Sequence, residues 1–389
     1  MRKTITIDDL GTIITGKTPP TTNKNYYGDY AVFIKPTDIS EQCKFTYETE
    51  EMYSKLAAEK YESSLIPKGA ICVPCIGTIG TKMTMAPCDC YTNQSINSIV
   101  CNENYDNEYV YYLIKNFLPG LKAYNLGTAS GREYVSKSNF EKIELVAEQD
   151  KTIQKKIGEL LSRYDSLIEN YQKQIKLLEE AAQRLYKEWF VDLRFPGHEN
   201  TKIVDGVPEG WEKKTIGDIV VYHDKQRKPL SSMQRMNMEK IYPYYGAAAL
   251  MDYVDSYLFD GIYLLFGEDG TVITPDNFPV LQYVWGKFWV NNHAHVIRGI
   301  DGVSTEFLYS MFKEMPIADV VTGAAQPKIS QGRLSDKKIL MPSLKLIQEW
   351  SCTAKHYFGR IRMITDQIRH LTEARDRLLP KLMSGEIEV

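Results

Sequence analysis

The segment Gly11–Thr18, GTIITGKT, has the spacing of a phosphate-binding P-loop. In a P-loop, backbone N–H groups and a lysine hold nucleotide phosphates, which requires a strand before the loop and a helix that begins directly after it. Here Pro19 and Pro20 follow Thr18, and a proline disfavours the helical conformation in the residue before it. We therefore expect no helix after this segment. A P-loop NTP-binding protein stays as an alternative, which ATP binding that depends on Lys17 would support.

Four cysteines have spacings that could hold zinc. Cys72 and Cys75 form a C-x-x-C pair, and Cys88 and Cys90 lie downstream. A structural zinc site needs four ligands that converge as a tetrahedron, and a C-x-C pair suits that geometry poorly. Residues Ala70–Ile76 also form a run typical of a buried strand, in which cysteine packs as a small apolar side chain. We therefore predict no zinc site there.

Histidine offers a further candidate for metal chemistry. His293 and His295 alternate along a strand-like stretch and lack an obvious third ligand, so we interpret them as polar surface or base-contacting groups. The sequence contains no H-E-x-x-H motif and no Asn/Asp-Pro-Pro-Tyr/Phe tetrapeptide of a methyltransferase. We predict no metal, no bound cofactor and no catalytic residue in this chain.

The composition limits the class of protein. A chain of 389 residues predicts two or more domains, and 43% hydrophobic with 25% charged residues is typical of globular proteins. No apolar run approaches the roughly 20 residues of a membrane span, the N-terminus has no signal-peptide core, and seven unpatterned cysteines suit a reducing compartment. We expect a cytoplasmic protein without membrane contact. Because the net charge is −3, any nucleic-acid contact must use local basic residues or a surface that a partner supplies.

The second half of the chain repeats the first. Gln174–Leu185 and Gln367–Leu378 share seven of twelve residues at an offset of 193. Fainter matches precede each of these segments in the same order: Ile7–Leu10 with Ile216–Ile219, Ile76–Gly80 with Phe266–Gly270, Asn93–Ser95 with Asn291–His293, and Gly127–Ser130 with Gly323–Gln326. The chain therefore reads as a globular domain followed by a long helix, twice.

The two helical segments have apolar residues in alternating steps of four and three, the spacing of a coiled-coil seam. These positions are Ile153, Ile157, Leu160, Tyr164, Leu167, Tyr171, Ile175, Leu178, Ala182, Leu185 and Trp189 in the first, and Ile347, Trp350, Ala354, Tyr357, Ile361, Ile364, Ile368, Leu371 and Leu378 in the second. The matching seams favour two long helices packed antiparallel, with a pair of ordinary core helices as the alternative. The globular parts read as mixed α/β with short strands, at Tyr30–Ile34, Ala70–Ile76, Ile262–Phe266 and Val280–Val284.

This pattern resembles one family over essentially the whole chain, the specificity (S) subunits of type I restriction-modification systems. The segments that carry the resemblance are Phe33–Ile39, Ile66–Ile71, Ile76–Gly80, Asn93–Ser95, Tyr186–Asp192, Asp205–Glu212, Tyr245–Gly246, Phe266–Gly270, Gly323–Ser330 and Arg377–Ile387. The first half departs from the family where Ala129–Arg132 replaces the usual Gln-Pro element.

The resemblance implies an α+β protein with two mixed α/β target-recognition domains in tandem, separated by two long helices that form an antiparallel coiled coil. Its expected parts are target-recognition domain 1 (1–149), the first long helix (150–192), a linker (193–209), target-recognition domain 2 (210–343), and the second long helix with the C-terminal tail (344–389). Each domain would read one half of a bipartite target in double-stranded DNA, and the helices would set the spacer between the halves. Two methyltransferase (M) subunits would dock on the helices and methylate adenine at N6.

The resemblance places every cofactor in the partners: S-adenosylmethionine in the methyltransferase subunits, and ATP with Mg in two endonuclease/translocase (R) subunits where the system has them. Whether such subunits exist, or the system only methylates, is open. A coiled-coil adaptor that does not bind DNA is the remaining alternative, and it predicts no DNA affinity even with a methyltransferase subunit present.

Direct readout pairs arginine or lysine with guanine, and asparagine or glutamine with adenine. Such residue types on loops beside glycines predict DNA contacts from Lys17, Thr18, Lys35, Asn93, Gln94, Ser130 and Arg132 in the first domain, and from Lys225, Arg227, Lys228, Tyr245, Asn292, His293, Gln326 and Lys328 in the second. For each of them, a solvated loop position or a phosphate contact without sequence content is an open alternative.

Overall fold

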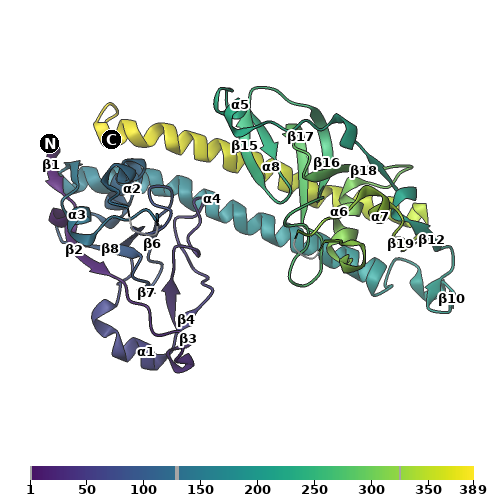
Figure 1. Ribbon diagram of the computed structural model, residues 1–389, viewed down its shortest axis with the longest axis horizontal. Helices are drawn as coiled ribbons and strands as arrows, with labels where there is room; N and C mark the ends of the chain where they lie inside the picture. Colours follow the sequence, from purple (N-terminus) through teal and green to yellow (C-terminus); the bar gives the residue numbers. More distant parts are fainter. Residues whose placement is uncertain (1, 128–130, 324–325) are drawn as a thin grey trace. The chain divides into compact units, whose positions relative to one another are not determined.

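The computed structural model describes residues 2–127, 131–323 and 326–389 (Figure 1). The chain folds into two compact units, the first formed by residues up to Gln172 together with Asp366–Val389, the second by Lys173–Thr365. The two longest helices, α4 (Lys151–Tyr186) and α8 (Leu344–Ser384), each contribute one segment to each unit. Among the described residues, no helix combines the length and the apolar character needed to cross a membrane.

The first unit contains three small sheets. Their strands, in hydrogen-bonded order, are β1 (Arg2–Thr6) and β9 (Glu144–Glu148); β2 (Gly11–Thr15), β8 (Ile96–Cys101), β5 (Ile71–Pro74) and β6 (Thr84–Met85); and β4 (Met52–Tyr53), β3 (Tyr27–Ile34) and β7 (Tyr91–Thr92). All pairs are antiparallel except β3 with β7, which run parallel. The short helices are α1 (Lys55–Lys60), α2 (Asn107–Phe117) and α3 (Lys137–Glu141). The strands predicted at Tyr30–Ile34 and Ala70–Ile76 are confirmed.

The second unit is built around a six-stranded sheet. Its strands, in hydrogen-bonded order, are β13 (Val220–Tyr222), β18 (Ala294–Gly299), β16 (Phe259–Gly267), β17 (Leu281–Val290), β14 (Tyr242–Tyr245) and β15 (Leu250–Val254). Two further pairs are β12 (Glu212–Thr215) with β19 (Lys338–Met341) and β10 (Ile203–Val204) with β11 (Val207–Pro208). The short helices are α5 (Ser232–Met236), α6 (Thr305–Lys313) and α7 (Gln331–Ser335). The strands predicted at Ile262–Phe266 and Val280–Val284 are confirmed.

The two units share one topology. The pair β1–β9 matches β12–β19, and the order β2-β8-β5 matches β13-β18-β16. The described part of each unit also has one parallel strand pair, β3–β7 in the first and β14–β17 in the second. The turn after the first strand is also repeated: the backbone N–H and hydroxyl of Thr6 donate to Asp9 Oδ2 (2.7 and 2.9 Å), and those of Thr215 donate to Asp218 Oδ2 (2.7 and 2.8 Å). The repeat seen in the sequence is therefore a repeat of structure.

One of the sequence matches is wrong by three residues. Gly77 N donates to Glu133 O (2.9 Å), and Gly270 N makes the equivalent bond to Pro327 O (3.1 Å). Both glycines have positive φ, +95° and +84°, which favours glycine at this turn. The structural counterpart of Gly77 is therefore Gly270, whereas the match of glycine patterns had paired Gly77 with Gly267.

Within each unit, the segments of α4 and α8 run antiparallel and belong to the core. In the first unit Asp165 of α4 pairs with Arg375 of α8, while Lys156, earlier in α4, donates to the carbonyl of Val389 (3.4 Å). In the second unit the rings of Tyr186 and Trp350 lie 5.8 Å apart, and a shallow groove brings together residues farther from these rings along both helices, among them Ile175, Glu179, Ile361 and Thr365. A π-helical turn, Lys187–Val191, continues α4.

The predicted seam of α4 needs one correction. Leu167, predicted to be a seam residue, is 45% exposed, whereas Asp165 is 3% exposed and lies between the buried Leu161 and Ile168. The buried face also covers the start of α2, because a Cβ on Gly158 would lie 2.9 Å from the backbone nitrogen of Tyr109. Leu167 lies outside this buried face.

Candidate nucleic-acid interface

In the first unit, four loops meet at one end of the β2-β8-β5 sheet. Thr15, the last residue of β2, pairs with Asn97, and Pro74, the last residue of β5, pairs with Ile96, the first residue of β8. The loops after β2, before β8 and after β5 therefore lie at the same end. The segment 131–134 joins them, because Gly77 N donates to Glu133 O and Val135 N donates to Cys75 O (2.8 Å).

The loops after β2 and before β8 touch each other directly. Lys17 N donates to Thr92 O (2.9 Å), and the Thr18 hydroxyl donates to the Gln94 side chain. Gly16 is required at this crossing, because a Cβ there would lie 2.1 Å from Thr92 O. The backbone of this group is held by Tyr53, whose hydroxyl donates to Lys17 O (2.5 Å).

The structure brings four predicted residues together, Lys17, Thr18, Asn93 and Gln94, and Lys17, Thr18 and Gln94 are exposed. Lys35 follows β3, whose Ile34 O accepts from Asn93 N (3.1 Å), but its ammonium pairs with Glu50 (2.7 Å) and Glu51 (3.2 Å). Arg132 is exposed on the segment that contacts Gly77. Ser130 lies outside the described residues.

The nucleotide and zinc alternatives can be examined at the same loops. Gly11–Thr15 is strand β2 itself, and no helix follows Thr18 directly, as expected from Pro19-Pro20. Cys72 and Cys75 are buried, and burial raises the pKa of their thiols to about 11 and about 12. The prediction that they pack as small apolar side chains is confirmed.

The second unit has the same four loops at the matching end of its sheet. Tyr222, at the end of β13, pairs with Ile297, and Gly267, at the end of β16, pairs with Ala294, the first residue of β18. Residues 326–329 join these loops, because Gly270 N donates to Pro327 O and Ile329 N donates to Glu268 O (2.8 Å).

The predicted residues of this unit lie on these loops. Lys225 and Lys228 are exposed after β13, Asn292 and His293 are exposed before β18, and Gln326 and Lys328 are exposed on the joining segment. Tyr245 O accepts from Asn291 N (3.1 Å), but the Tyr245 ring packs against Phe288 with 5.9 Å between ring centroids.

Arg227 is not displayed toward solvent. Its side chain is 12% exposed, and its guanidinium donates to Glu268 (2.7 Å) and to Ala294 O (2.6 Å) and lies 3.5 Å from Asp224 Oδ2. These contacts hold the Arg227 side chain inside the protein, whereas the sequence predicted that it reads bases. Lys225 and Lys228, on either side of it, keep exposed side chains.

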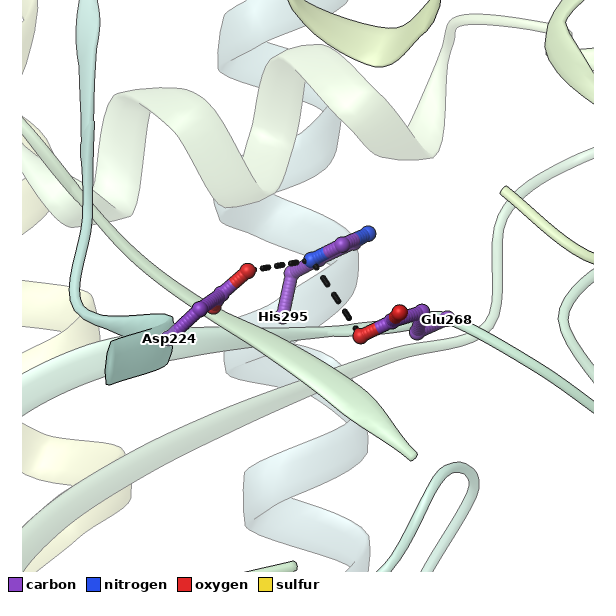
Figure 2. A group of neighbouring side chains, drawn as sticks. All are labelled: Asp224, Glu268 and His295. Atoms are coloured by element: carbon purple, nitrogen blue, oxygen red, sulfur yellow. Dashed lines mark hydrogen bonds and ion pairs between the residues drawn. The ribbon is translucent and has the colours of Figure 1, made fainter. Parts of the chain in front are cut away.

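His295 is also an inner residue, so its interpretation as a surface or base-contacting group is wrong. It is 1% exposed, with its imidazole between the carboxylates of Asp224 and Glu268 (Figure 2). Nδ1 lies 2.6 Å from Asp224 Oδ2 and 3.6 Å from Glu268 Oε2, and Nε2 lies 2.9 Å from Ile329 O. Both ring nitrogens therefore lie against oxygen atoms of the protein.

The pKa of Asp224 reflects the same contacts. Burial by itself would raise it, but the hydrogen bond and charge of His295, the N–H of Val296 and the charge of Arg227 together lower the pKa below its ordinary value. Sequence reasoning missed Asp224 altogether. Its partner His295 is distant in the chain and becomes a neighbour only through the β13–β18 pairing.

Asp224, Glu268 and His295 offer ligand atoms within 4.8 Å of one another, a spacing that a metal site could have. A metal needs a lone pair on an imidazole nitrogen, and here both nitrogens are engaged with oxygen atoms. The guanidinium of Arg227 already supplies positive charge to both carboxylates. The donor set therefore fits an ion cluster of two acids and two bases, which we call the Asp224 cluster (Asp224, Arg227, Glu268 and His295), and it does not fit a metal centre.

Comparison with known proteins identifies the family of this chain. The family model described as "Type I restriction modification DNA specificity domain" matches residues 2–180 and 208–360. The type I restriction enzyme MjaIX specificity subunit of Methanocaldococcus jannaschii is 26% identical over 406 residues, covering 98% of this chain and 93% of its own. The HindI specificity subunit of Haemophilus influenzae is 36% identical over 164 residues, covering 40% of this chain and 35% of its own.

A solved structure supports the same fold. The S subunit of the type I restriction-modification system from M. genitalium aligns with a TM-score of 0.58 and 18% identity, over 98% of this chain and 96% of that one. The family match covers most of the 389 residues in both halves of the repeat. The chain belongs to the family of type I restriction-modification specificity subunits, which are non-catalytic.

Proposed function

We propose that this chain selects the DNA target of a type I restriction-modification complex, with each unit reading one half of a bipartite sequence. The observation that carries the proposal is the matching pair of loop groups at equivalent sheet ends, one in each unit. Both groups present exposed lysine and amide side chains, such as Lys17 and Gln94 in the first, Lys225 and Asn292 in the second. Lysines neutralise phosphates, and amides can recognise base edges.

We assign the residues in line with the sequence expectation. The target-recognition domains are 1–149 and 210–343, the long helices lie within 150–192 and 344–389, and 193–209 is the linker. Of the predicted contacts, Lys17, Thr18, Asn93, Gln94, Arg132, Lys225, Lys228, Asn292, His293, Gln326 and Lys328 are proposed to face DNA. Lys35, Arg227 and Tyr245 are proposed to support the loops, because their side chains are engaged within the protein.

The long helices are proposed to set the spacer. The 36 residues of α4 span about 54 Å at 1.5 Å per residue. B-DNA rises about 3.4 Å per base pair, so a spacer measured by this antiparallel pair stays below two turns of the duplex. The helices would also dock two methyltransferase subunits, which hold S-adenosylmethionine. Because the chain carries a net charge of −3, much of the DNA affinity would come from those partners.

The decisive experiment maps N6-methyladenine in the host genome with the gene intact and deleted. The expected result is a split motif, two short specific halves around unspecified bases, that disappears on deletion and returns on complementation. A P-loop NTPase or a coiled-coil adaptor predicts no change in the methylated motif. An unchanged methylome in cells that express the protein would refute the proposal.

A further inference from the structure

The two loop groups are built on equivalent positions, which makes a residue-by-residue comparison possible. Cys75 N donates to Ser95 O (2.7 Å), and Glu268 N makes the same bond to His293 O (2.9 Å). The positions Thr15, Asn97 and Cys75 of the first unit therefore correspond to Asp224, His295 and Glu268 of the second, as the strand pairs Ile13–Ile99 and Tyr222–Ile297 also require.

The chemistry at these positions differs between the units. In the first unit the Thr15 hydroxyl donates to Asn97 Oδ1 (2.7 Å), and burial keeps the Cys75 thiol protonated by raising its pKa to about 12. All three side chains are neutral. In the second unit the same three positions hold two carboxylates and a histidine, and Arg227 completes the Asp224 cluster.

The contacts of the Asp224 cluster join several loops. Asp224 and Arg227 come from the loop after β13, Glu268 from the loop after β16, and His295 from β18. Arg227 donates to Ala294 O, and His295 contacts Ile329 O on the joining segment. Glu268 also lies 3.7 Å from the ammonium of Lys328. The cluster therefore fixes, through charged contacts, the backbone of all four loops that carry the proposed DNA contacts of this unit.

The charges of the cluster are largely shielded from water: His295 is 1% exposed, and the side chains of Asp224, Arg227 and Glu268 are 11%, 12% and 16% exposed. Removing one member of a buried ion set leaves its partner without compensation in a medium that solvates it poorly, so the remaining groups move or draw in water. A neutral hydrogen-bonded set such as Thr15 and Asn97 has no equivalent charge to expose. A change of charge in the Asp224 cluster should therefore disturb the loops of the second unit. The first unit has neutral side chains at the equivalent positions, and the Tyr53 hydroxyl there holds Lys17 O.

We propose that Asp224, Arg227, Glu268 and His295 are positioning residues for half-site recognition by the second unit, and that recognition by the first unit does not depend on charge at the equivalent positions Thr15, Asn97 and Cys75. This inference rests on the proposed function of the two loop groups. The cluster touches no DNA in this scheme; it acts through the positions of Lys225, Lys228, Asn292 and Lys328.

The test uses the complete native system in host cells, with single substitutions at the chromosomal gene. Glu268→Gln removes one charge at nearly constant shape, and His295→Asn installs the residue type found at Asn97. The matched control is Glu212→Gln, which removes an exposed carboxylate from β12 of the same unit, 3.6 Å from Lys214. The readout is the N6-methyladenine motif, scored base by base in each half.

We expect Glu268→Gln and His295→Asn to relax one half of the motif, with about ten-fold less discrimination against mismatches there. The other half should keep its native sequence, and the control should keep both. Arg227→Lys, which retains the cation, should give a smaller relaxation in the same half. A general folding defect would lower methylation at every site without this asymmetry.

Native discrimination in both halves for the cluster variants would overturn the inference, as would equal relaxation of both halves. Where a variant lowers the amount of complex, the motif is read from the sites that remain methylated and from the milder variant Arg227→Lys. Native discrimination in both halves, or equal relaxation of both halves, would overturn the inference there too. If deletion of the gene leaves the methylome unchanged, the proposed function itself fails. If deletion abolishes the motif but the cluster variants leave it intact, only the present inference fails.

Discussion

Replacing Arg375 by alanine should destabilise the first unit, because it leaves the buried carboxylate of Asp165 without its cationic partner. Arg375 and Asp165 are 4% and 3% exposed, and the guanidinium of Arg375 donates to Asp165 Oδ1. The other oxygen, Oδ2, accepts from the Tyr112 hydroxyl (2.5 Å). Burial, followed by the charge of Asp165, raises the pKa of Tyr112, so this hydroxyl remains a donor. In the variant, Asp165 would keep one hydrogen bond and lose its only buried cationic partner among the ion pairs of the described residues.

The size of the effect follows from the burial of the pair. Removing one partner of a buried ion pair costs about 3–5 kcal/mol in the free energy of unfolding, whereas replacing the whole pair by apolar groups is often neutral. The control is Arg377→Ala in the same helix. Arg377 is 79% exposed and pairs with Glu373, so its loss should change the free energy of unfolding by less than about 0.5 kcal/mol.

The repeat supplies the replacement for the whole pair. At the offset of 193, Asp165 corresponds to Phe358 and Arg375 to Ala182, and both of these are buried in the second unit. The variant Asp165→Phe/Arg375→Ala, with Tyr112→Phe to remove the hydroxyl that would lose its acceptor, copies that apolar arrangement. We expect it to recover most of the stability that Arg375→Ala alone removes.

The assay must separate the two units. All five tryptophans lie within Lys173–Thr365, so tryptophan fluorescence follows the second unit. Native-state hydrogen exchange of the α2 amides follows the first, and it yields free energies of local opening. Two results would refute the reasoning: a loss below about 1 kcal/mol for Arg375→Ala, or a triple variant no more stable than that single substitution.

Three further outcomes are expected. Insertion of one heptad into both α4 and α8 adds about 10 Å, so the spacer of the methylated motif should lengthen by about three base pairs; an unchanged spacer would contradict the helices as its measure. Lys225→Ala and Lys228→Ala should each weaken DNA binding by the assembled complex and reduce the slope of log affinity against log salt by about one, as measured in anisotropy titrations; an unchanged slope would show that neither lysine contacts phosphate. The pKa of Asp224 is lowered from 3.8, so its carboxylate stabilises the second unit above that pH, and the contribution is lost as the pH falls toward the lower folded value. Asp224→Asn should therefore flatten the acid limb of the fluorescence stability profile, and an identical limb would contradict this assignment.

The parts of the fold that depend on local pattern could be predicted from the sequence. The long helices and strands such as β16 follow from residue spacing over short windows, and the repeat follows from matching the two halves of the chain. The failure of the P-loop motif also follows locally, because Pro19-Pro20 decides it within two residues. The same local method misjudged Leu167, because the face of α4 that is buried depends on α2, which approaches at Gly158.

The sequence could predict which loops form the candidate interface, but it could not predict which of their side chains are engaged within the protein. Residues such as Lys225 and Asn292 stand out by side-chain type and by their place between predicted strands. The inward position of Arg227 follows from Glu268 and Ala294, which strand pairing brings to it from distant parts of the chain. The local sequence around a histidine in a strand does not indicate whether carboxylates from distant segments will contact it. For this reason the prediction for His295 was wrong.

The repeat shows what buried charge contributes in this protein. At the sheet end, the first unit uses Thr15 and Asn97 where the second uses Asp224 and His295; between the helices, the first unit uses Asp165 and Arg375 where the second is apolar. In both comparisons the same topology is built with and without the charges, so neither ion set is needed to specify the backbone. We therefore expect the two ion sets to affect how rigidly the neighbouring helices or loops are held. For Asp165 and Arg375 this is a helix pair, and the effect is measured as stability. For the Asp224 cluster it is a set of loops, so loss of base discrimination in one half of the target should appear before any loss of fold.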